Sequence, residues 1–253
     1  MRRIIIIGTA LVVLGAAGAA FAANFNNYNG SKLAISANKG PLSMVETLKA
    51  NAPPGQRAAP LIRIVVKISG VKLDVGKLPV CTDSLILKNK TQPTGGCSKN
   101  SLIGTGLVHA LLGPGNDSSA SKGTACNPHL NVFNGGPKTQ VFYFWTKSAT
   151  DCGGLTTGAT APYDGKISYS GGNAIINVPL PPDISTKVAN QPGLYGSLIG
   201  ETLNFTKKVA GKPYMVSTSC KNHKRPWSIT FTAQKYSSTQ TETSTVKGSS
   251  SCA

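Results

Sequence analysis

The segment from Leu61 to Val75 constrains the fold of this chain most, because its apolar side chains recur at every second position. One face of the segment is entirely β-branched and consists of Ile62, Ile64, Val66 and Ile68. The alternate positions carry Arg63 and Lys67. A period of two is typical of a β-strand that is buried on one side, whereas an amphipathic helix would need a period of 3.6.

Shorter segments with the same character follow along the chain, separated by turn residues such as Gly171-Gly172-Asn173. They are 32–36, 44–48, 102–112, 130–133, 140–146, 163–170, 174–178, 202–206, 214–219 and 227–234. Helical periodicity is almost absent, with one short helical turn expected after Cys81, capped by Thr82 or Asp83, and a second after Cys97. This pattern predicts an all-β fold, an antiparallel β-sandwich, with a barrel as the alternative arrangement.

The first 22 residues have the build of a secretory signal peptide. Arg2 and Arg3 form a basic head, an apolar run follows, and Ala20-Phe21-Ala22 is a cleavage signal. We therefore expect export, cleavage after Ala22, and no transmembrane span in the mature chain. The alternative is an uncleaved anchor, because the apolar stretch is just long enough to cross a bilayer.

Residues 23–236 are expected to form a single domain. A split, if there is one, falls in the Gly/Ser/Asp-rich loop at 113–125. Residues 237–253 are rich in Ser and Thr and are expected to form a tail that Cys252 tethers.

The cysteines are even in number and all follow the export signal. In an oxidising compartment this predicts three disulfides. Six cysteines allow 15 pairings, and pairing of sequence neighbours closes the smallest loops. We therefore favour Cys81–Cys97, Cys126–Cys152 and Cys220–Cys252.

Without the signal peptide the chain keeps 24 basic and nine acidic residues, a net charge of +15. The basic residues are spread along the chain, and 21 of them are lysines. Base reading and bidentate phosphate recognition favour arginine, so we expect no sequence-specific nucleic-acid binding. The charge indicates either a solvated cationic surface, which is the simpler interpretation, or attraction to polyanions such as acidic wall polymers.

The densest basic run ends directly before a tryptophan. One interpretation is a cationic loop with an aromatic platform for an anionic or sugar ligand, formed by Lys221, Lys224, Arg225 and Trp227. The other is a basic turn followed by a buried strand that begins at Trp227. The second is favoured, because strand alternation resumes at Ser228.

Two aromatic residues form a second candidate surface. Tyr143 and Trp145 share one face of segment 140–146, and Phe142 and Phe144 share the other. We expect the phenylalanines in the core, and Tyr143 and Trp145 on an outer or groove face that could bind carbohydrate.

No catalytic residue and no metal ligand can be assigned. The serine-hydrolase motif G-x-S-x-G does not occur. There is no C-x-x-C pair, and His109, His129 and His223 show no zinc-ligand spacing. We expect neither a metal nor another cofactor.

The nine acidic residues are scattered, and we interpret most of them as turn or cap residues. Asp83 and Asp183 suit caps, and Asp117 and Asp164 suit turns. A non-enzymatic protein is therefore expected. Carboxylates can still pair in space, as glycoside hydrolysis requires. A hydrolase of glycans or envelope polymers is the alternative.

Four phrases of the chain resemble an uncharacterised family of secreted proteins from high-GC actinobacteria. They are Cys152–Tyr163, Val178–Ser185, Gln191–Ser197 and Arg225–Trp227. The resemblance covers most of the mature chain. It implies export and a bacterial cell-envelope setting, and it assigns no activity, substrate or functional residue.

Taken together, these features predict a secreted or cell-surface protein that binds anionic wall polymer or polysaccharide through a cationic surface. A third possibility is a subunit of an extracellular assembly, for which an exposed apolar patch or an unpaired edge strand would be the sign. The oligomeric state is left open.

Overall fold

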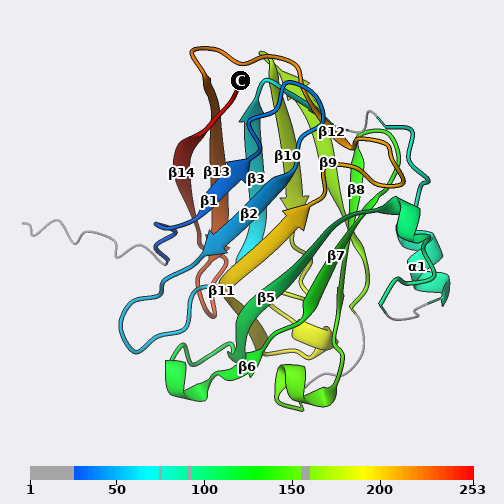
Figure 1. Ribbon diagram of the computed structural model, residues 1–253. Helices are drawn as coiled ribbons and strands as arrows, with labels where there is room; N and C mark the ends of the chain where they lie inside the picture. The colour runs from blue at the N-terminus through cyan, green and yellow to red at the C-terminus, as the bar shows by residue number, and fades with distance from the viewer. Residues whose placement is uncertain (1–25, 74–75, 90–92, 155–159) are drawn as a thin grey trace, which may run out of the picture.

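The computed structural model describes residues 26–73, 76–89, 93–154 and 160–253 (Figure 1). Within them the chain forms strands β1 Lys32–Ile35, β2 Met44–Lys49, β3 Leu61–Ser69, β4 Val71–Leu73, β5 Leu102–Pro114, β6 Thr124–Cys126, β7 His129–Asn134, β8 Thr139–Trp145, β9 Tyr163–Ser170, β10 Asn173–Pro179, β11 Leu194–Phe205, β12 Met215–Ser217, β13 Lys224–Gln234 and β14 Thr241–Ser251. Helix α1 spans Asp83–Asn89, and short 3-10 turns occupy Lys99–Ser101, Ala120–Lys122, Ala149–Cys152 and Val188–Asn190. The signal-peptide prediction for residues 1–22 lies outside the described residues.

One antiparallel sheet contains all but two of these strands. Its order is β1-β2-β11-β5-β7-β8-β9-β10-β3-β13-β14, with β6 paired to β5, while β4 and β12 form a separate small pair. The two ends of the sheet meet, because the Ser250 hydroxyl of β14 accepts a hydrogen bond from Ile35 N (3.2 Å) and donates one to Leu33 O (3.0 Å) of β1. We call this junction of β1 and β14 the seam (Figure 1).

The prediction of an all-β, antiparallel, disulfide-linked fold is confirmed, but the arrangement is barrel-like rather than a strict two-layer sandwich. Alternation along each strand is the same in both architectures. Closure depends on long-range pairings, such as β2 beside β11, and on the accumulated twist of the sheet. Neither is written in the local pattern.

The alternation of β3 places its apolar side chains inside, as predicted. Ile64, Val66 and Ile68 are buried, and Arg63 and Lys67 are exposed. A register shift between β13 and β3 at Ala233 places Leu61 in the interior, so Ile62 is only half-buried.

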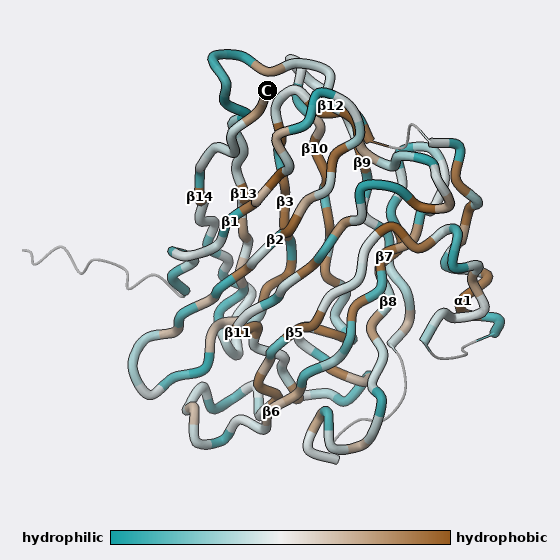
Figure 2. Tube along the Cα trace, viewed as in Figure 1, coloured by the Kyte–Doolittle hydropathy of each residue, from teal (hydrophilic) through white to brown (hydrophobic). Residues whose placement is uncertain are grey.

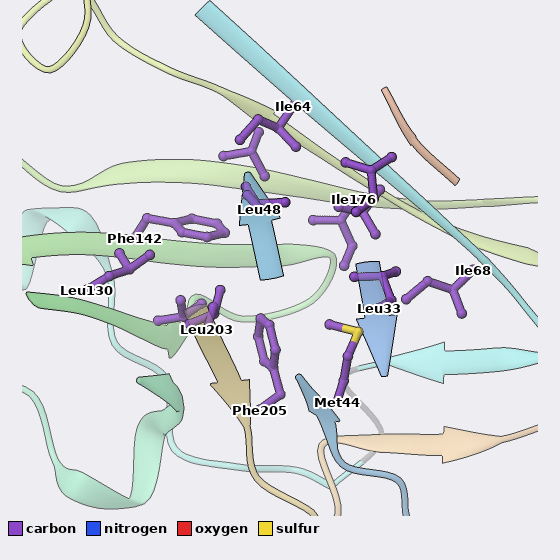
Figure 3. Close-up of a cluster of buried hydrophobic side chains, with 14 of the residues drawn as sticks. Leu33, Met44, Leu48, Ile64, Ile68, Leu130, Phe142, Ile176, Leu203 and Phe205 are labelled. Carbon is purple, nitrogen blue, oxygen red and sulfur yellow. The ribbon is translucent and has the colours of Figure 1, made fainter. Parts of the chain in front are cut away.

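Along the chain, hydrophobic residues follow the strands and hydrophilic ones gather in connecting loops (Figure 2). The inward side chains of strands far apart in sequence meet in one core (Figure 3).

The three predicted disulfides, Cys81–Cys97, Cys126–Cys152 and Cys220–Cys252, are all present. Helix α1 lies in the loop that the Cys81–Cys97 bridge closes. The Thr82 hydroxyl accepts a hydrogen bond from Leu85 N (3.3 Å), as predicted for the cap of this helix. The bridge and Ile86 of α1 belong to a second apolar cluster with Tyr143. The helix therefore covers part of the outer face of β8.

Residues 241–251, expected within a tail, form strand β14 instead. Thr243 and Thr245 face Thr232 and Thr230 of β13, and the pair Thr230–Thr245 is hydrogen bonded at 2.9 Å. β-branched residues at every second position favour a strand even when they are polar. The possible domain split was placed in the loop at 113–125. Strands β5 and β6, at the two ends of this loop, pair with each other in the same sheet. No helix in the described parts of the chain is long and apolar enough to span a membrane.

Candidate functional site

The structure separates the residues of the predicted cationic and aromatic loop. Lys221 and Lys224 are exposed, whereas Arg225 and Trp227 are 1% and 8% exposed. Strand β13 begins at Lys224, so its alternation directs Arg225 and Trp227 inward. The Arg225 guanidinium donates to Ser36 O (3.3 Å) and to the Ser217 hydroxyl (2.8 Å), contacts that join the chain beyond β1 to β12. A surface polymer can reach only the two lysines.

The second predicted surface is also covered. Tyr143 is 1% exposed beneath the Cys81–Cys97 bridge and α1. Trp145 is half-buried and stacks on His129, with ring centroids 4.4 Å apart. Phe142 and Phe144 lie in the main core as expected. Three strands separate β8 from β13 in the sheet, so the structure does not bring the two predicted groups together.

The interior of the closed sheet contains a cavity of about 110 Å³. Its walls come from eight strands and from the segment after β10. Most of the lining is aliphatic or aromatic, including Ile64, Val108, Leu130, Phe142, Phe144, Ile176, Val178, Leu180, Ile184, Leu198, Leu203 and Phe205. Phe142, Leu130, Leu203 and Phe205 project into the same interior space (Figure 3). This concave, mostly apolar space with a few polar groups is the usual form of a small-molecule site.

Glu46 enters this apolar space from β2. It shares a face of the strand with Met44 and Leu48, and it is 6% exposed. The two neighbours point inward because they are apolar, and the period of two forces the carboxyl between them to follow.

Glu201 enters from β11, and a β-bulge directs it inward. The pairing of β11 with β5 shifts between Leu198 and Gly200, leaving Ile199 as an extra, exposed residue. A shift of one residue exchanges the faces of a strand. Without the bulge Glu201 would face solvent. With it, Glu201 lies on the inner face with Leu203; it is half-buried and lines the cavity.

The two acidic residues are neighbours across the pair β2–β11. Glu201 is opposite Leu48, Thr202 is opposite Thr47, and Leu203 is opposite Glu46. The same tripeptide, Glu-Thr-Leu, is thus paired with itself. This places the two carboxyls on one diagonal of the inner face, about 7–8 Å apart at Cβ and within reach of long side chains.

Burial changes the charge of this acid pair. Removal from water raises the pKa of Glu46 to about 7. Burial, with a smaller contribution from the nearby Glu46 charge, raises the pKa of Glu201 to about 8. Groups this close titrate together. At neutral pH the pair therefore retains at least one proton.

Further polar side chains line the cavity. Gln140 of β8 is 1% exposed and lines the cavity; its amide nitrogen donates to the Tyr214 hydroxyl (3.2 Å), but its carbonyl oxygen has no partner among the described residues. Tyr163 of β9 also lines the cavity, and burial, with the charges of Glu201 and Asp183, raises the pKa of its phenol well above 10. Burial raises the pKa of Asp183 as well.

The site was missed at the sequence level, although a signal for it exists. We interpreted the acidic residues as turn and cap residues. Glu46 is in phase with Met44 and Leu48, and Glu201 is in phase with Leu203 and Phe205. An acidic residue in phase with the buried face of a strand predicts a buried carboxyl. In the described residues, no cluster of three or more His, Cys, Asp or Glu could hold a metal ion.

The chain matches no family model, no curated protein and no solved structure. The functional argument therefore rests on the cavity itself. Its walls offer apolar contact on most sides, and its polar groups are concentrated in the acid pair and Gln140.

Proposed function

We propose that this protein is a disulfide-stabilised binding protein of the cell exterior that holds a small, mostly apolar molecule inside its closed sheet. The observation that carries the proposal is the apolar cavity of about 110 Å³ with two carboxyls in its wall, Glu46 buried and Glu201 half-buried. Export is supported by the three disulfides, which persist in oxidising compartments.

The size of the cavity limits the ligand. An apolar cavity of roughly 150 Å³ in an engineered protein stays dry and takes up benzene. A ligand of similar or slightly smaller size, such as a small ring or a short alkyl chain, suits the space described here. Burial of its surface contributes roughly 25 cal/mol for each Å² removed from water.

Benzene titration followed by methyl NMR tests this proposal. We expect shift changes confined to leucine, isoleucine and valine methyls of the cavity wall, such as Leu203 and Val108. Ala110→Leu fills the cavity and should weaken benzene binding at least tenfold. Ala34→Leu, on the exposed face of β1, adds the same group outside and should leave binding unchanged. Shift changes that avoid the cavity wall, or equal effects of the two variants, would reject the proposal.

The outer surface supports a second candidate function, attraction to an anionic polymer. Cations that are far apart in sequence meet on the outward side of β9, β10, β3, β13 and β14, which we call the outer face (Figure 1). They are Arg63, Lys67, Lys166, Lys224 and Lys247. In these five strands, which the structure describes in full, the outward positions hold one carboxylate, Asp164, paired with Lys166 at 2.6 Å.

Hydroxyl and amide groups surround these cations. Ser228 lies between Lys67 and Lys247 in the register of the sheet, and Arg63 Nε donates to the Asn177 side chain (2.7 Å). Lysine is a flexible point charge that attracts polyanions without fixed geometry. Five cations and one carboxylate give the outer face a net charge of +4, which supports the binding of acidic wall polymer or polysaccharide.

Polyphosphate binding at two salt concentrations tests the outer face. Lys67→Gln/Lys247→Gln should weaken binding severalfold in low salt, while Lys39→Gln/Lys99→Gln, exposed elsewhere, should have a smaller effect. Binding should fall steeply with salt. Equal losses of affinity in the two double variants would show that net charge alone drives binding, and would reject the outer face as the binding surface.

A hydrolase of glycans was the alternative at the sequence level, and the acid pair meets one of its requirements. We do not adopt it. A sugar needs hydrogen-bond partners for its hydroxyls, because burying an unpaired hydroxyl costs roughly 1–3 kcal/mol. The cavity walls are mostly apolar, so they favour a different ligand.

A further inference from the structure

Most polar side chains in the cavity wall are hydrogen-bond acceptors. Glu46 and Glu201 supply carboxyl oxygens from β2 and β11, and Gln140 supplies a buried carbonyl oxygen with no partner among the described residues. No lysine, arginine or histidine is among the described residues that line the cavity. Buried acceptors without donors are unfavourable in a folded protein, unless a ligand completes them.

The chemistry of these acceptors defines the ligand group that would complement them. It must donate several hydrogen bonds, because two neighbouring carboxyls line the space, and it must tolerate or carry positive charge for the same reason. A carboxylate ligand would add a third negative centre. An alcohol donates only one hydrogen bond. An ammonium group donates three and has no acceptor.

Accordingly, and resting on the proposed function above, we infer that the ligand is a small alkylamine: Glu46 and Glu201 bind its ammonium group, and the apolar walls hold its hydrocarbon part. One ionised carboxyl beside one protonated carboxyl balances the charge of the ammonium. The complex is then neutral overall, which the apolar surroundings require.

This arrangement makes binding depend on pH. Tyr163 of β9 lies near Glu201, and Asp183, from the segment after β10, lies near Tyr163. The phenol stays neutral up to high pH, so ionisation of the acid pair dominates. Amine affinity should rise as pH rises from 5 to 8, because one carboxyl must lose its proton. It should fall above about 10.4, where a primary amine loses its charge.

The test compares n-propylamine, n-propanol and propionate, which are matched in length and small enough for the cavity. Binding is measured by NMR titration at pH 8. We expect propylamine to bind at least tenfold more tightly than propanol, and propionate to bind most weakly. In Glu46→Gln/Glu201→Gln the preference for amine over alcohol should shrink to within about twofold, while propanol binding persists.

The double variant should remain folded, because it replaces two carboxyls by neutral groups of the same shape; thermal unfolding checks this. Phe205→Leu, a change in the apolar wall, is the matched control and should alter propylamine and propanol binding together. Propanol binding without a preference for amine, or a preference that survives in the double variant, would overturn the inference and leave the proposed function standing. Absence of binding by all three compounds and by benzene would reject both.

Discussion

The seam and the cavity both contain buried polar groups, but the two regions differ in how many hydrogen bonds these groups make. At the seam, Ser250 joins β1 to β14 through two hydrogen bonds. Beside it, Arg225 of β13 donates to Ser36 O and the Ser217 hydroxyl, while its Nε has no partner among the described residues. In the cavity, Gln140 keeps an unpartnered oxygen, and two carboxyls share an apolar space. Hydrogen bonds such as those of Ser250 hold a fold together, whereas two neighbouring carboxyls in an apolar space mark a place where another molecule can bind. Removal of seam groups should therefore destabilise the protein, and neutralisation of the cavity acids should stabilise it.

The largest effect is expected at the seam disulfide. Cys220 and Cys252 close a loop with a sequence separation of 32 residues and fix the end of β14. Cys220→Ser/Cys252→Ser should lower the free energy of unfolding by roughly 3–4 kcal/mol in the chain-entropy model. Urea unfolding measures the loss. A loss below 1 kcal/mol would show that the closed sheet does not depend on this link.

Arg225→Met comes next, with an expected loss of about 3 kcal/mol. The change strands the Ser36 carbonyl and the Ser217 hydroxyl in a buried site, and unsatisfied buried partners cost about 1–3 kcal/mol each. Arg63→Met on the outer face is the control and should stay within about 0.5 kcal/mol of the wild type. Similar losses in both variants would contradict the structural role of Arg225.

Substitution of the acid pair should raise the free energy of unfolding, whereas the two preceding substitutions lower it. Because folding raises the pKa values of Glu46 and Glu201, the folded state favours their protonated forms. Stability is then complete below the unfolded pKa, about 4.3, and declines as pH rises through about 7 to 8. Glu46→Gln/Glu201→Gln should remove the decline that the pair causes. Urea unfolding of both proteins at pH 5 and pH 9 isolates the difference, and parallel pH curves would refute it.

The smallest effect is expected for the Ser250 hydroxyl. Ser250→Ala removes both hydrogen bonds between β1 and β14, and we expect a loss of about 1 kcal/mol. Ser249→Ala, on the exposed side of the same strand, should be neutral. Hydrogen exchange of the Ile35 amide should accelerate in the first variant alone, and unchanged exchange would count against closure through this residue.

Much of the fold could be predicted from the sequence, because period-two alternation and turn residues are local signals. The inward face of β3 was identified in this way, with Ile62 the one residue misplaced, since a register shift depends on the neighbouring strand. Three disulfides followed from the small loops they close. The strand at 241–251 was missed because its alternation is written in threonine and serine rather than in apolar residues.

The candidate site was much harder to predict. Glu46 carried a local signal, its phase with Met44 and Leu48. Glu201 shared a phase with Leu203, but the bulge at Ile199 that makes this phase inward arises from pairing with β5. The outer face could not be predicted for the same reason. Lys67 and Lys247 lie on either side of Ser228 only because β13 pairs with both β3 and β14.

The sequence by itself determined which residues alternate and where most strands and turns fall, since these depend on near neighbours. It favoured one cysteine pairing among 15, which the structure then showed. The tertiary structure alone decided that the sheet closes, that Glu46 and Glu201 meet across β2 and β11, and that their carboxyls keep protons. The physical reason is that closure, diagonal contact and desolvation are properties of strands brought together from distant parts of the chain, where no local pattern records their partners.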